Sequence, residues 1–397
     1  MVGSFPVQVF SLVIVCLLSS FSYSVDIAGK AQLELTSYAD EGQFSKQDYR
    51  YNTSVAIEPE LYWEWDDAKH SIVFRPFLRG DQQDAERSHG DIRELSWLYV
   101  GDHWEWRLGL RKVFWGVAEF NHLVDVINQT DAVDSLDGEE KLGQPMINAS
   151  RVMDWGIVDV FVLPGFRERT FAGSQGRLRS GFVVNTDTPL YESPREEKHV
   201  DYALRWTHSV DVFDLGAYWF EGTDREPELQ LHTATASLHP FYRQTRQWGI
   251  DAQATIDSWL WKLEAIHKDV GDDHFWASQS GVEYTFYGVA SSAADIGVLV
   301  EYGWDQRRFS ATSIAQNDIY LGARWTLNDA NDTALLAGVS YDVDYHTRSL
   351  LLEASRRLSD YWTVALEGAI FHSDSTVDPV AALIEDDRLQ LVFERYF

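Results

Sequence analysis

One local pattern repeats along this chain from residue 29 to its last residue: about ten residues alternate between apolar and polar, and a polar connection follows. Successive side chains of a β-strand point to opposite faces, so each segment predicts a strand with one apolar and one polar face. The predicted strands are 29–39, 52–65, 70–80, 91–101, 103–114, 154–163, 166–171, 199–208, 212–221, 246–257, 259–268, 276–287, 294–303, 316–327, 333–344, 348–358, 361–371 and 387–397.

The connections between these segments alternate in length. Short links such as 65–69 and 358–361 trade places with longer polar ones such as 40–51 and 372–386. Short turns at one end and long loops at the other are typical of an all-β transmembrane antiparallel β-barrel. Counting 166–171 as a strand gives about 18 strands, and 16 is the alternative if it is omitted and another pair merges. A soluble sandwich or propeller also has many short strands, but no repeated motif supports a propeller.

The N-terminus carries an apolar run that ends at Leu18 and is followed by several serines. The run is shorter than the roughly 20 residues that a membrane-spanning helix needs, so residues 1–24 predict a cleaved export signal. Residues 25–397 then form a single barrel domain without cysteine, because Cys16 is the only cysteine of the chain. The net charge of −29 makes nucleic acid a poor partner.

Charged residues follow the polar faces of the N-terminal strands. On 52–65, Val55 and Ile57 share the apolar face, while Glu58 and Glu60 lie on the other. If the apolar faces contact lipid, the polar faces line the lumen. The predicted channel-lining residues are Glu58, Glu60, Arg75, Arg79, Glu94, Glu105, Arg107, Arg111, Arg167 and Arg169.

The last strand ends the chain on an aromatic residue. Leu389, Leu391, Phe393 and Phe397 share one face, and this ending resembles that of the porin class of Gram-negative outer-membrane barrels, although Arg395 departs from the apolar residue usual there. The resemblance implies an outer-membrane location and contact with outer-membrane lipid and lipopolysaccharide. It also implies insertion by the barrel-assembly machinery and passage of small hydrophilic solutes through the lumen.

Two long loops stand out, at 115–153 and 172–197. The first combines acidic and apolar residues and resembles the loop that porins fold into the barrel. Facing the arginines at 75, 79, 107 and 111, it would form a charged constriction; the alternative is an outer loop packed over its own apolar residues. The constriction candidates are Glu119, Asp125, Asp131 and Asp134.

The segment Arg167-Glu168-Arg169 has no assigned chemistry. Two arginines two residues apart on a strand point the same way, which suits bidentate binding of a carboxylate or phosphate. Salt bridges to lumen acids are the simpler reading.

The function expected from these features is passive diffusion of small hydrophilic solutes through a charge-lined channel. A barrel that acts in envelope assembly or binds a partner without conducting is the alternative, and an outer-membrane hydrolase is a minor one. The histidines are scattered outside recognised catalytic signatures, so we expect no catalytic residue, cofactor or metal site. A homo-oligomer is left open.

Overall fold

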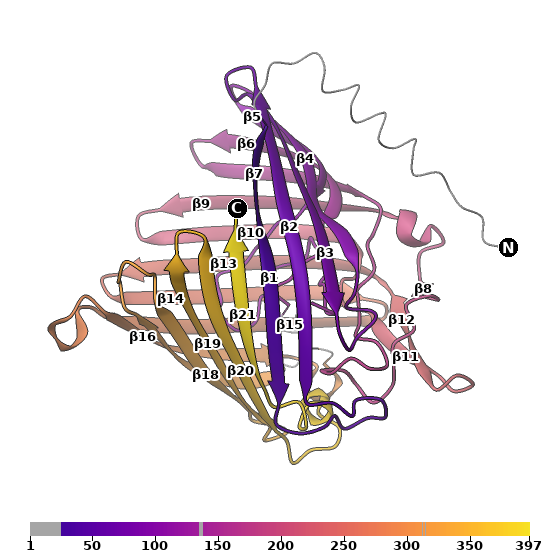
Figure 1. The fold of residues 1–397 in the computed structure, drawn as a ribbon. Helices are drawn as coiled ribbons and strands as arrows, with labels where there is room; N and C mark the ends of the chain where they lie inside the picture. The colour runs from indigo at the N-terminus through magenta and orange to yellow at the C-terminus, as the bar shows by residue number, and fades with distance from the viewer. Residues whose placement is uncertain (1–24, 135–137, 312, 314) are drawn as a thin grey trace.

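Eighteen antiparallel strands form one sheet in the computed structural model, which describes residues 25–134, 138–311, 313 and 315–397. The first strand pairs with the second on one side and with the last on the other, so the sheet closes into a barrel (Figure 1). A closed barrel has no unpaired strand edge, which lets a sheet cross hydrocarbon. The barrel strands are β1 Asp26–Tyr38, β2 Tyr51–Trp65, β3 His70–Asp81, β4 Gly90–Val100, β5 Trp104–Arg111, β6 Gln144–Met153, β7 Gly156–Pro164, β9 Val200–Val210, β10 Phe213–Thr223, β13 Gln244–Ile256, β14 Trp259–Val270, β15 Asp273–Phe286, β16 Asp295–Asp305, β17 Asn317–Thr326, β18 Ala334–Asp342, β19 Arg348–Ser359, β20 Trp362–His372 and β21 Arg388–Tyr396.

The predicted all-β barrel of 18 strands is confirmed, and the predicted export signal at 1–24 lies outside the described residues. Both ends of the barrel chain lie at the end of the short turns, which we call the turn end; the other is the loop end. The alternation fails in the C-terminal half. β14 and β15 are joined at the loop end by only two residues, 271–272, and the turn-end links 287–294 and 327–333 are both longer than the loop-end link 343–347.

A small separate sheet lies beyond the barrel strands. Its strands are β8 Leu190–Tyr191, β11 Glu228–His232 and β12 Ser237–Tyr242, and Figure 1 shows the β11–β12 hairpin projecting away from the barrel. The helices of the described residues are short 3-10 turns: η1 Glu196–Lys198, η2 Val289–Ser291, η3 Arg308–Ser310 and η4 Pro379–Ala382. None of the helices in the described ranges is long and apolar enough to cross a membrane.

The apolar faces of the strands point outward, as predicted. On β2, Val55 is 54% exposed and Ile57 42%, whereas Ala56 between them is 8% exposed. On β13, Trp248 and Ile250 are likewise half exposed. Large apolar side chains left exposed in continuous rows around a barrel are the surface that lipid covers in a membrane.

The prediction of a strand at 166–171 is wrong. The strand that completes the count of 18 is β6, which lies within the segment predicted as a loop. Residues 166–171 alternate in sequence but run as an irregular segment after β7. Strand β6 escapes the alternation test because its outward positions include Pro145, Ala149 and Arg151. Arg151 keeps its charge at the turn end, where it lies 5.2 Å from the ring centroid of Trp104.

The predicted loop 115–153 therefore runs only over 112–143, between β5 and β6, and we call it the constriction loop. The predicted loop 172–197 lies within the connection 165–199, which also carries β8 and η1.

The constriction loop packs inside the barrel, so the alternative of an outer loop is wrong. Val124 and Ile127 are fully buried, and the Trp115 ring lies 5.6 Å from that of Phe161 and 5.1 Å from that of Tyr218. Burying an aliphatic side chain of this size stabilises by about 1.5–3 kcal/mol. The loop thus shares an apolar core with the inner faces of β6, β7, β9, β10, β14 and β15.

Candidate functional site

One buried carboxylate on the barrel wall binds three backbone N–H groups of the constriction loop. Glu264 on β14 is 0% exposed. Its Oε1 accepts hydrogen bonds from the N–H of Val117 at 2.7 Å and of Ala118 at 2.9 Å, and its Oε2 accepts from Val124 at 3.2 Å. A Cβ at Gly116 (φ +146°) would lie 3.0 Å from Oε1, so glycine permits the close approach. The three N–H donors offset part of the cost of burying this carboxylate.

A second carboxylate holds the next two residues of the loop. Glu301 on β16 is 1% exposed. It accepts hydrogen bonds from the N–H of Glu119 at 2.8 Å and of Phe120 at 3.3 Å, and from the Gln279 side chain at 2.9 Å. We call Glu264 and Glu301 the latch carboxylates. Together they fix the loop across the lumen, from its start at the end of β5 to the wall formed by β14–β16.

The side chains at the latch add an ion pair and a ring stack. The Glu119 carboxylate binds Arg324 on β17 and lies 3.4 Å from Nζ of Lys262. The Phe120 ring stacks on that of Tyr320, with centroids 4.8 Å apart and planes 13° apart. These contacts extend the attachment of the loop as far as β17.

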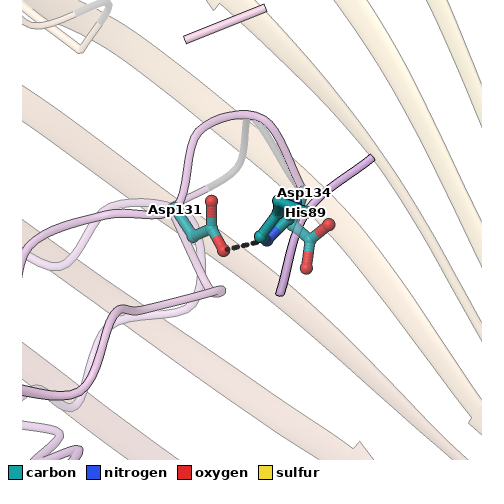
Figure 2. A group of neighbouring side chains, drawn as sticks. All are labelled: His89, Asp131 and Asp134. Atoms are coloured by element: carbon teal, nitrogen blue, oxygen red, sulfur yellow. Dashed lines mark ion pairs between the residues drawn. The ribbon is translucent and has the colours of Figure 1, made fainter. Parts of the chain in front are cut away.

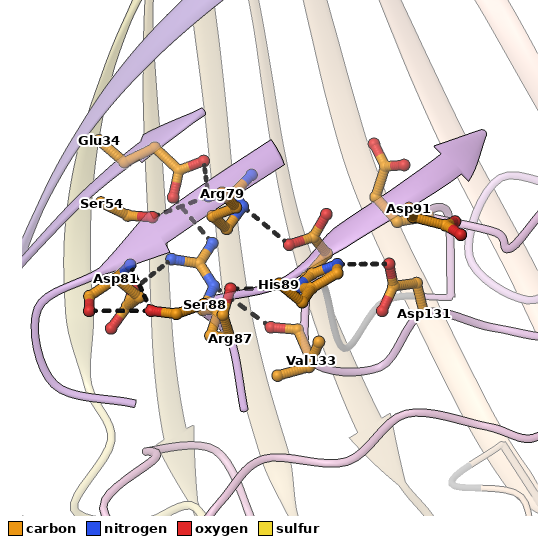
Figure 3. A network of polar contacts seen from close by, with 12 residues as sticks. Glu34, Ser54, Arg79, Asp81, Arg87, Ser88, His89, Asp91, Asp131 and Val133 are labelled. Carbon is orange, nitrogen blue, oxygen red and sulfur yellow. Dashed lines mark hydrogen bonds and ion pairs between the residues drawn. The ribbon is translucent and has the colours of Figure 1, made fainter. Parts of the chain in front are cut away.

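The other end of the loop is tied to the N-terminal strands by buried ion pairs (Figure 3). Arg93 on β4 is 1% exposed and donates to both Asp131 and Asp134 of the loop. Nε of Arg79 on β3 lies 2.9 Å from Asp134, and Arg79 also binds Glu34 on β1. Removing one partner of such a buried pair typically costs 3–5 kcal/mol, so these contacts hold the loop firmly.

His89, Asp131 and Asp134 bring three ligand-type atoms within 4.8 Å of one another (Figure 2). The positive charge at this place comes from the guanidinium of Arg93, which binds both carboxylates. A metal ion would have to displace it, so we assign the cluster to the ion-pair network.

The contacts of His89 favour its doubly protonated form. Nδ1 lies 3.0 Å from the carbonyl oxygen of Arg87, and Nε2 lies 3.6 Å from the Asp131 carboxylate. Both neighbours are acceptors, so each nitrogen is best served by an N–H. The neighbouring Asp131 carboxylate raises the pKa of His89, against the opposing effect of burial. Burial disfavours the charge of Asp131, yet His89 and Arg93 hold the pKa of this carboxyl well below its usual range.

A cavity of about 1300 Å³ remains in the lumen beside the constriction loop. Among the described residues, sixteen carboxylate and ten Lys or Arg side chains line it. Glu353 on β19 lies directly opposite Glu367 on β20, an arrangement of like charges that costs stability. With sixteen carboxylates against ten Lys or Arg side chains, the described lining has an excess of acidic residues.

The predicted residues fall into two groups. Those that line the cavity are Glu58, Arg79 and Arg169 from the predicted channel wall and Glu119, Asp125 and Asp134 from the predicted constriction. Asp125 is paired with Lys141 at 3.1 Å, and the fourth loop acid, Asp131, is fully buried.

The remaining predicted residues pair with one another or with their neighbours. Arg75 binds Glu60 and lies 3.5 Å from Glu94, and Arg107 binds Glu105. Arg111 donates to Asn148 at 3.4 Å, and Arg167 binds Asp91 at 2.8 Å. Among the described residues, Arg79 alone of the predicted row at 75, 79, 107 and 111 pairs with a loop acid, while the other three bind residues of the barrel wall.

Sequence reasoning missed Glu264, Glu301, Arg93 and His89 as parts of the site. The alternation places Glu264 on the polar face of its strand together with Lys262. A glutamate on the polar face of a strand has the same sequence context whether it faces water or the backbone of a distant loop. No local signal therefore separates the two cases.

No protein-family model and no curated protein sequence matches the chain. Among solved structures, it is similar to OpdQ of Pseudomonas aeruginosa, with a TM-score of 0.53 and 10% identity over 95% of this chain and 98% of that one. It is also similar to Wzi of Escherichia coli, described as an outer-membrane protein involved in group 1 capsule assembly and a carbohydrate-binding β-barrel. The TM-score is 0.54 and the identity 9%, over 92% of this chain and 84% of Wzi.

Identities this low show the fold alone. The chain has the fold of an outer-membrane-type β-barrel, closed here by 18 strands.

Proposed function

We propose that this barrel is a channel in the outer membrane of a Gram-negative bacterium, through which small hydrophilic solutes diffuse past a fixed constriction. One observation carries the proposal: the latched loop narrows the lumen but leaves a charged cavity of about 1300 Å³ beside it. A wet, polar lumen inside an apolar outer surface is the arrangement of a diffusion channel.

The constriction is permanent in this proposal. Five backbone N–H groups on the latch carboxylates and the buried pairs of Arg93 leave the loop no independent freedom to swing out of the barrel. The loop therefore sets the size limit for solutes, and the acidic excess of the lining favours cations over anions.

The test is recording from purified protein in a planar lipid bilayer bathed in potassium chloride. We expect uniform stepwise increases in current. Under a salt gradient, the sign of the reversal potential should show that cations pass more readily than anions. Protein that inserts, as judged by resistance to protease, but produces no steps would contradict the proposal.

A barrel that binds a partner without conducting is the second candidate. Two observations favour it: the loop core fills one side of the lumen, and the β8–β11–β12 sheet projects beyond the barrel. The fold similarity to Wzi is consistent with it. Insertion without conductance in the same recording would support this candidate.

A further inference from the structure

The segment Phe166–Thr170, which we call the strap, runs from the end of β7 along the lumen and is tied at each of its last four residues. Arg167 binds Asp91 and the carbonyl oxygen of Gly143. Glu168 accepts a hydrogen bond from the Tyr191 hydroxyl.

The other two ties fix the end of the strap. The backbone N–H of Arg169 donates to the Tyr242 hydroxyl at 3.0 Å, and the Thr170 hydroxyl donates to Asp131 at 2.6 Å. Arg167 is therefore fully used by the scaffold, and the two arginines of the strap do not act as a pair. The backbone that carries Arg169 is held rigidly.

Unlike Arg167, the Arg169 side chain forms no hydrogen bond or ion pair with the scaffold among the described residues. It lines the cavity, and in the described part of the chain no carboxylate forms an ion pair with it. Its Nε is buried without a hydrogen-bond acceptor. Eight of the ten basic residues of the lining are in ion pairs, namely Lys30, Arg79, Arg87, Arg93, Lys141, Arg225, Lys268 and Arg307.

Glu226 is the acid with the largest electrostatic effect on Arg169, but it does not form an ion pair with it among the described contacts. Burial lowers the pKa of Arg169, and Glu226 only partly opposes this. Glu226 itself lies 3.8 Å from Lys268, which also binds Asp224 at 2.9 Å. Arg169 therefore lines the cavity without an ion-pair partner among the described residues, and its Nε is buried away from the open space.

A guanidinium presents its N–H groups in a planar fork that matches two oxygens of a carboxylate or phosphate. Charges held inside proteins are normally paired, so the unpaired guanidinium on the cavity wall calls for a counter-charge that the described residues do not supply. We propose that Arg169 is an oxyanion-binding subsite of the lumen, which takes the carboxylate or phosphate group of a small solute held against the strap.

Arg388 is the other lining arginine without an ion pair among the described residues. It differs from Arg169 because none of its nitrogens is a buried orphan. It serves as the internal comparison in the test.

The test is calorimetric titration of detergent-solubilised protein with sodium gluconate, a carboxylate probe, and with sodium phosphate at matched ionic strength. We expect saturable binding of at least one probe, weakened at least tenfold by Arg169→Met and less by Arg169→Lys, which keeps the charge but not the fork. Whichever probe binds identifies the preferred oxyanion.

Two matched variants control for a general loss of positive charge. Arg388→Met and Arg356→Met, the latter outside the cavity on β19, should bind as the native protein does. Absence of binding to native protein, equal binding to Arg169→Met, or a loss confined to Arg388→Met would each overturn the proposal. The titration measures binding and not current, so its result does not depend on whether the barrel conducts. Only the identification of the oxyanion as part of a passing solute rests on the proposed channel function.

Discussion

Single side chains decide whether this lumen is narrow or wide. Glu264 and Glu301 lie on nearby strands of the wall, and each is almost fully buried. Each accepts hydrogen bonds from main-chain N–H groups of the constriction loop, which lie 140 to 182 residues earlier in the chain. The N–H donors offset part of the cost of burying each carboxylate, and Nζ of Lys262 lies 4.0 Å from Glu301. These two carboxylates hold the backbone of the loop against the far wall, beside the Glu119 ion pairs and the Phe120–Tyr320 stack.

Replacing Glu264 by alanine should release that attachment. Three buried N–H groups lose their acceptor, and each unsatisfied group costs about 1–3 kcal/mol. We expect faster cleavage by protease within 112–143 and a lower unfolding temperature in detergent. Glu221→Ala, which removes an outward-facing glutamate paired with Arg246, is the matched control. Equal protease resistance of both variants would show that the latch does not hold the loop.

His89 should give the barrel a pH-dependent contribution to stability. Its pKa in the folded protein is raised from 6.5, so the contact with Asp131 stabilises fully below that value and is lost as pH rises through the raised one. The difference in unfolding temperature between the native protein and His89→Gln should therefore be larger near pH 5 than near pH 9. An equal difference at both pH values would contradict the assignment of a charged His89.

Among the strands, alternation predicts most of the fold and fails where the outward face is not apolar. The segment 52–65 predicts β2 almost to the residue, because lipid requires Val55 and Ile57 outside. Strand β6 is missed because Arg151 and Pro145 interrupt its outward face. For the site, the sequence shows the acids of the loop but not their partners, because Asp134 and Arg93 meet only through the tertiary fold.

The seam between β1 and β21 depends on a close approach at Gly29. A Cβ there would lie 2.7 Å from Cα of Pro59 and 2.8 Å from the ring of Phe397. Gly29→Ala should therefore destabilise the closed barrel by about 1–3 kcal/mol, as overpacking does. Heat-induced shifts in electrophoretic mobility measure this. Gly80→Ala, where the nearest atom would lie 3.8 Å away, should behave as the native protein; equal effects of both would argue against a tight seam.

The whole barrel combines an apolar outside with an interior divided in two. The constriction loop and the inner faces of β6, β7, β9, β10, β14 and β15 form a packed core, while the acid-rich cavity lies beside the loop. The N–H of Phe397 donates to the carbonyl oxygen of Gly29 at 3.0 Å and so joins the two ends of the barrel.

The most direct test of this account compares single-channel conductance of the native protein and of Glu264→Ala/Glu301→Ala in planar bilayers. The native barrel should conduct in small uniform steps, and the variant, with its loop released from the far wall, in larger and noisier ones. Absence of steps in the native protein, or steps of equal size in both, would contradict a channel narrowed by a latched loop.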